Sequence, residues 1–132
     1  MKRRDFLLTG RLPALFIGHG SPMNIVEKNR FTENMAKIAA SIPRPKAILC
    51  VSAHWETNGT KVLAADRPRQ IFDFFGFPQE LYEVSYKPEG AKAVAESVVP
   101  LVAGRGHNVR VAEDWGLDHG TWSVLHHLYP EA

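Results

Sequence analysis

Three short segments of this chain each place a histidine beside a glycine or another small residue. They are Gly18-His19-Gly20-Ser21-Pro22, Ser52-Ala53-His54-Trp55 and Asp118-His119-Gly120-Thr121-Trp122. Neutral imidazole is the commonest protein ligand for mid-row divalent metals, and it is also the commonest acid–base group near neutral pH. Three such segments in 132 residues predict a metal-dependent catalytic site that contains His19, His54 and His119.

Two apolar runs end directly before the first two of these histidines. Residues 12–17 and 47–52 have the composition of buried strands in a parallel sheet. Right-handed crossovers bring the carboxyl ends of neighbouring parallel strands to one edge of the sheet, where open α/β folds place their chemistry. We therefore expect His19 and His54 to face a single crevice, although 35 positions separate them.

The rest of the chain alternates between helical and extended patterns. Apolar residues at helical spacing predict a helix over residues 30–41, which Pro43 and Pro45 end. Further patterns predict strands over residues 61–65 and 108–112 and helices over residues 91–103 and 121–129. Residues 66–90 are rich in aromatic side chains and have no clear period, so we expect a long functional loop and a candidate pocket wall.

This alternation predicts an α/β fold with a mainly parallel sheet flanked by helices. The predicted strands are few, and the apolar segment at residues 125–129 lies close to the end of the sequence. Both features indicate an incomplete, truncated domain. We therefore expect residues 12–132 to form the N-terminal part of a larger catalytic domain.

The composition favours a globular protein without a nucleic-acid or membrane partner. A formal charge of +2 arises from 16 basic and 14 acidic side chains, and no basic stripe is present. No segment approaches the roughly 20 apolar residues of a membrane span. The single cysteine, Cys50, rules out an internal disulfide, fits a reducing compartment and is expected to be buried. The oligomeric state does not follow from the sequence.

The N-terminus resembles the start of a twin-arginine export signal at Arg3-Arg4. Such a signal needs an apolar stretch of about 7–15 residues, and here Arg11 and Pro13 interrupt it. We therefore interpret residues 1–11 as a basic tail or a vestigial leader, and we expect the protein to be cytoplasmic.

Three further histidines are assigned structural roles. His126 and His127 are adjacent on a predicted helix, so their side chains diverge by about 100° and cannot easily chelate one ion together. His107 lies in a glycine-containing segment and is expected to be an exposed loop residue.

The segments around the first three histidines resemble the class III extradiol ring-cleavage dioxygenases, in the DOPA dioxygenase branch. Residues 15–24 (LFIGHGSPMN) are similar to the opening of that family and are the most specific part of the likeness. Residues 52–55 (SAHW) and 115–122 (WGLDHGTW) are similar to the next two family signatures, in the right order. Residues 72–86 are similar to the stretch between them, so the resemblance covers nearly the whole chain from Leu12 onward.

The resemblance implies a set of roles for these residues. His19 and His54 would be metal ligands, and His119 would be a catalytic pocket histidine that acts in acid–base chemistry or supports the ligands. The family binds Fe(II) for oxygen chemistry, Zn(II) is often recorded in this branch, and the substrates would be a DOPA-like catechol and O2. Members are much longer than this chain, and a further metal ligand and a second active-site histidine lie in the additional part.

Two other functions fit the same residues. A zinc-dependent hydrolase on a related α/β scaffold would also use histidines at strand ends, because they suit a zinc-activated water. The chain could equally be an inactive truncated fragment that binds metal.

Overall fold

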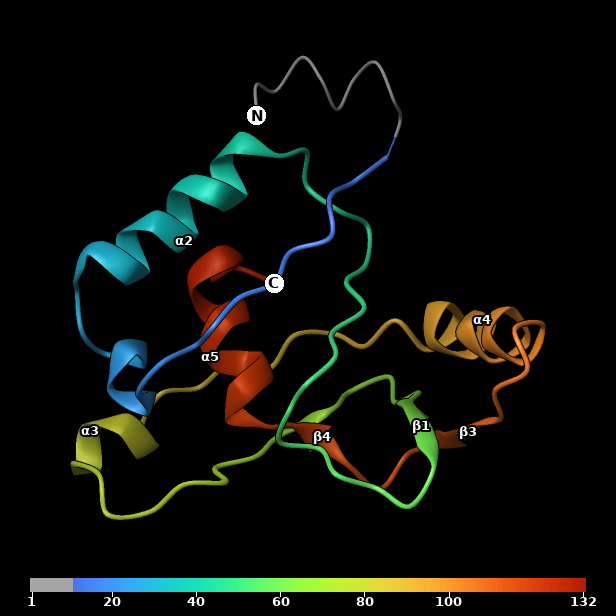
Figure 1. The fold of residues 1–132 in the computed structure, drawn as a ribbon. Helices are drawn as coiled ribbons and strands as arrows, with labels where there is room; N and C mark the ends of the chain where they lie inside the picture. Colours follow the sequence, from blue (N-terminus) through green and yellow to red (C-terminus); the bar gives the residue numbers. More distant parts are fainter. Residues whose placement is uncertain (1–10) are drawn as a thin grey trace.

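The computed structural model describes residues 11–132, in which helices and strands alternate along the chain (Figure 1). The predicted basic tail or leader at residues 1–11 therefore falls, apart from Arg11, outside the described residues. None of the helices in residues 11–132 combines the length and the apolar character that a membrane crossing requires.

The elements form an α/β fold with parallel strand pairing, as expected. In chain order they are the 3-10 helix η1 (Pro22–Ile25), α2 (Arg30–Ser41), β1 (Thr60–Leu63), β2 (Arg69–Gln70), α3 (Gln79–Tyr82), α4 (Lys92–Ala103), β3 (Val109–Ala112), β4 (Gly116–Leu117) and α5 (His119–Leu128). Strand β1 pairs in parallel with β3, and β2 pairs in parallel with β4. The predicted helix over residues 30–41 is confirmed, and so are the strands and helices near residues 61–65, 91–103, 108–112 and 121–129.

The prediction of strands at residues 12–17 and 47–52 is wrong. Neither segment belongs to either strand pair of the described residues, and Phe16 and Val51 are 104% and 93% exposed. An apolar run indicates a preference for burial, but a strand also needs a neighbour that satisfies its N–H and C=O groups. The described part of the chain offers these two segments no such neighbour.

The expectation that Cys50 is buried is also wrong. The residue is exposed, because residues 47–52 do not form a central strand. Its Sγ lies 3.5 Å from the Oγ1 atom of Thr121 on α5, and partial burial against this helix raises the pKa of the thiol.

Helix α5, drawn in red in Figure 1, lies at the centre of the described residues and packs against η1, α2 and β4. Trp122 is fully buried in a cluster with Ile25, Leu81 and Tyr86, and its Nε1 donates a hydrogen bond of 2.9 Å to the Ile71 carbonyl oxygen. A second cluster joins α2 to the C-terminal end of α5. The helix that carries His119 is therefore the most extensively packed one.

Helix α4 and the β1–β3 pair form a separate layer on the other side of the fold (Figure 1). Val62 of β1, Ala95 of α4 and Val109 of β3 are buried together in this layer. The layer contributes no side chain to the histidine group described below.

The N-terminus of α5 is set by Asp118, which lies directly before the first helical residue. Its Oδ1 accepts a hydrogen bond of 3.2 Å from the Thr121 N–H, as an N-cap carboxylate does. Because of this cap, the helix begins at His119 rather than at Thr121 as the apolar pattern suggested. His119 and Gly120 are thereby placed in the first helical turn.

We predict that Asp118→Ala lowers the free energy of unfolding by about 2–4 kcal/mol, since a buried, charged hydrogen-bond acceptor and a helix cap are lost together. The matched control is Asn29→Ala, which removes the cap of α2 and is expected to cost about 0.5–2 kcal/mol. Urea unfolding of both variants measures the difference. A cost for Asp118→Ala no greater than that for Asn29→Ala would contradict the bridging role of this carboxylate.

Candidate metal centre

His19 lies in the loop that leads into η1, and the conformation of this loop depends on Gly20 and Asn24. Gly20 has a φ of +68°, a conformation that glycine adopts at little cost. A Cβ at Gly20 would also lie only 2.7 Å from Nδ2 of Asn24, and that same Nδ2 donates a hydrogen bond of 3.1 Å to the His19 carbonyl oxygen. Gly20 therefore allows a tight turn after His19, and Asn24 fixes the position of the His19 backbone.

His54 is tied to α5 through a serine. The Oγ of Ser52 accepts a hydrogen bond of 3.1 Å from the His54 N–H and donates one of 2.6 Å to Oδ1 of Asp118. A Cβ at Gly120 would lie 2.5 Å from Cδ2 of His54, so only glycine lets the helix come this close. The Asp118-His119-Gly120 segment thus combines a cap, a functional side chain and the space for His54.

His119 is the most buried of the three histidines, with 7% of its side chain exposed. The edge of its ring meets Phe74 at a centroid distance of 5.4 Å and an interplanar angle of 89°. Phe74 comes from the aromatic stretch at residues 66–90, whereas Phe72 packs on Trp122 of the core. Phe74 of that stretch therefore contacts the histidine group, and Phe72 packs in the hydrophobic core.

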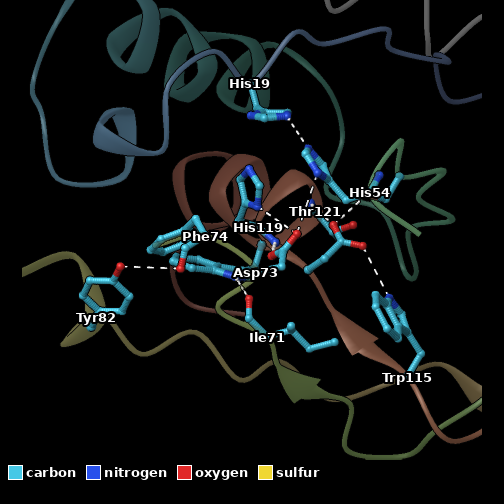
Figure 2. A network of polar contacts seen from close by, with 12 residues as sticks. His19, His54, Ile71, Asp73, Phe74, Tyr82, Trp115, His119 and Thr121 are labelled. Atoms are coloured by element: carbon cyan, nitrogen blue, oxygen red, sulfur yellow. Dashed lines mark hydrogen bonds and ion pairs between the residues drawn. The ribbon is translucent and has the colours of Figure 1, made fainter. Parts of the chain in front are cut away.

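The three histidine rings lie in mutual contact (Figure 2). Nε2 of His19 is 2.9 Å from Nε2 of His54, and the ring of His119 lies 5.0 and 4.1 Å from those of His19 and His54 between centroids. One donor nitrogen from each residue lies within 4.8 Å of the others. Side chains that are distant in the sequence thus form one group that could hold a metal ion.

The group fits a transition metal on two observations. Two imidazole nitrogens that bind one ion at about 2.0–2.1 Å from adjacent positions lie about 3 Å apart, and the two Nε2 atoms of His19 and His54 have that separation. Imidazole donors suit zinc, copper, iron or nickel rather than calcium or magnesium.

The electrostatics of the group favour the neutral form of the His19 ring. Burial lowers the pKa of His19 below its ordinary value, and the nearby His119 and His54 lower it further. The neutral ring is the form that binds a metal, so the site is arranged to accept a cation near neutral pH.

Two carboxylates lie behind the rings. Asp118 is adjacent to His119 in the sequence, whereas no residue pattern singled out Asp73. Oδ2 of Asp73 is 2.9 Å from Nδ1 of His119, and Oδ2 of Asp118 accepts a hydrogen bond of 3.4 Å from the indole Nε1 of Trp115. Burial acts to raise the pKa of Asp73, but hydrogen bonds from the backbone and the ring of His119 outweigh it and bring that pKa below its ordinary value. Asp73 therefore stays ionised at neutral pH.

The remaining histidines take no part in this group within the described residues. Nε2 of His127 is 2.7 Å from the Asn24 carbonyl oxygen, and the ring of His126 meets the edge of Tyr86. His107 is exposed in the loop before β3.

Comparisons with known proteins agree with the resemblance seen in the sequence. Residues 12–132 match the family described as the catalytic LigB subunit of aromatic ring-opening dioxygenase. A 4,5-DOPA dioxygenase extradiol of Escherichia coli (strain K12) is 47% identical over 130 residues, which cover 98% of this chain and 48% of the relative. A 4,5-DOPA dioxygenase extradiol of Beta vulgaris is 40% identical over 122 residues, which cover 89% of this chain and 45% of that relative.

This chain spans about half the length of the curated relatives it matches. The family match extends over all of the residues that build the histidine group and over the carboxylates behind it. On this evidence the chain belongs to the LigB family of aromatic ring-opening dioxygenases.

Proposed function

We propose that this protein is a non-haem, metal-dependent extradiol dioxygenase that opens the ring of a DOPA-like catechol with O2. The observation that supports this most is the group of three histidines whose donor nitrogens lie within 4.8 Å of one another. The group occurs in a chain whose relatives at 47% and 40% identity are named 4,5-DOPA dioxygenase extradiol.

In this proposal His19 and His54 hold the metal through their Nε2 atoms, which lie 2.9 Å apart. Fe(II) is the metal of the active enzyme, and Zn(II) is able to occupy the same nitrogens. When bound, ferrous iron would supply an electron-transfer route between the catechol and O2 and bring both reactants together.

His119 acts as the acid–base group. Its Nδ1 faces Asp73, so Nε2 is left free to accept a proton from a catechol hydroxyl and to return it as the ring opens. Phe74, which contacts the His119 ring, contributes an apolar surface against which an aromatic substrate packs.

The zinc hydrolase and the metal-binding fragment make different predictions from the dioxygenase. A hydrolase turns over with Zn(II) and without oxygen, whereas the proposed reaction consumes one O2 for each ring that opens. A fragment that only binds metal takes up Fe(II) or Zn(II) without consuming oxygen. Metal binding and oxygen uptake are therefore measured separately.

We predict that the purified chain binds a single Zn(II) or Fe(II) ion and that His19→Ala or His54→Ala abolishes stoichiometric binding, because each variant removes one of two adjacent donors. His107→Ala is the matched control, since this histidine is exposed and lies outside the group. Competition with a chromophoric chelator measures the affinity. Undiminished affinity in both site variants would contradict the assignment of the ligands.

We predict that the chain, loaded with Fe(II) under anaerobic conditions, consumes O2 and DOPA in equal amounts and forms a yellow ring-fission product. His119→Ala should keep the metal and lose about 10²–10⁴-fold in rate, the usual contribution of a general acid–base group. An oxygen electrode and the absorbance of the product record the reaction. Turnover with Zn(II) in the absence of oxygen would favour the hydrolase, and metal binding without oxygen uptake would favour the fragment.

A further inference from the structure

We propose that Asp73 is a positioning residue that fixes the orientation and the tautomer of His119. This inference rests on the proposed function, because it concerns how the imidazoles of that site are prepared for a metal and a proton. Asp73 lies between β2 and α3, in a stretch where no residue pattern pointed to a polar role.

Both oxygens of the Asp73 carboxylate face His119. Oδ1 accepts a hydrogen bond of 2.7 Å from the His119 backbone N–H, and Oδ2 lies 2.9 Å from Nδ1 of the same residue. The carboxylate therefore binds the backbone of His119 through a hydrogen bond and lies close enough to its ring to accept a proton from Nδ1.

The same carboxylate lies beside the second imidazole. Oδ2 of Asp73 is 3.7 Å from Nδ1 of His54, and the His54 and His119 rings lie 4.1 Å apart between centroids. The Nδ1 atoms of both rings thus lie on the side of Asp73. Nε2 of His54 is 2.9 Å from Nε2 of His19, on the side where a metal would bind (Figure 2).

An ionised carboxylate can only accept hydrogen bonds. The Nδ1 atom of His119 must therefore carry the proton in the neutral ring, which leaves the lone pair on Nε2. A carboxylate behind an imidazole also raises the basicity of the ring and fixes the nitrogen it presents. Both effects are what a metal ligand or a general base requires.

The position of Asp73 is itself fixed by its neighbours along the chain. The Ile71 N–H donates a hydrogen bond of 2.8 Å to the Leu117 carbonyl oxygen, which extends the β2–β4 pairing. The Ile71 carbonyl oxygen accepts a bond from the fully buried Trp122. Phe74, on the other side, packs against His119. The carboxylate is therefore held between two anchored neighbours rather than on a free loop.

A purely structural role would use only Oδ1, as an acceptor for the first N–H of α5. The Asp73→Asn variant separates the two roles, since it keeps the size of the side chain. Its amide oxygen can still accept from the His119 N–H, but its NH2 group can only donate toward Nδ1. Nδ1 must then act as the acceptor, so the proton moves to Nε2.

The test is long-range ¹H–¹⁵N NMR of the histidine rings in the metal-free chain at about pH 8, where an ordinary imidazole is neutral. We expect the Nδ1–H tautomer of His119 in the unmodified protein and a shift toward the Nε2–H tautomer in Asp73→Asn. Asp114→Asn is the matched control, because Asp114 is exposed.

Two results would overturn the proposal. One is an Nε2–H tautomer of His119 in the unmodified protein, a measurement that does not depend on whether any variant folds. The other is an unchanged tautomer in Asp73→Asn, since the residue would then act only on the helix end. Neither readout uses turnover, so a failure of the dioxygenase proposal would be recognised separately, as the absence of oxygen uptake.

Discussion

The buried carboxylate of Asp118 is the contact on which the candidate site depends. It is 1% exposed and joins α5 to the segment that carries His54, through the hydroxyl of Ser52 at 2.6 Å. Hydrogen bonds to an ionised group that is shielded from water are among the stronger ones in proteins. Because the same carboxylate caps α5, the position of His119 and the position of His54 are set by one side chain.

The approach of α5 to His54 also depends on the absence of a side chain at Gly120. Asp118, His119 and Gly120 are consecutive in the sequence. This one segment therefore provides the capping carboxylate, the candidate functional histidine and the space that His54 occupies. His19 comes from a different loop, whose geometry depends on Gly20 and Asn24. The histidine group therefore assembles from loops and a helix start, not from the ends of regular strands.

Local patterns predicted the elements that local interactions stabilise. Helix α2 was predictable because its apolar residues have helical spacing and Pro43 follows it, and β3 because polar and apolar residues alternate in its sequence. The apolar runs at residues 12–17 and 47–52 were wrongly predicted to be strands. A strand needs a neighbouring strand to pair with, and the composition of a segment does not show whether one is present. The prediction that His19 and His54 lie together nevertheless agrees with the structure, because the loops that follow both runs meet at α5.

Asp73 shows what residue patterns cannot supply. It lies in an aromatic stretch without periodicity, and only the tertiary contact with His119 gives it a role. The start of α5 is a similar case. The apolar pattern predicted that the helix begins at Thr121, but the cap at Asp118 makes it begin at His119. Exposed apolar side chains such as Phe16 and Val51 lie on a chain that spans about half the length of the curated relatives it matches.

The most direct test of a shared ion is X-ray absorption spectroscopy of the Zn(II)-loaded chain. Ligation by His19 and His54 predicts nitrogen scatterers at about 2.0–2.1 Å together with the outer-sphere pattern of imidazole rings. That pattern should weaken in His54→Ala and stay unchanged in His107→Ala. A first coordination sphere without the imidazole pattern would contradict the account, because the three rings would then be neighbours that hold no metal.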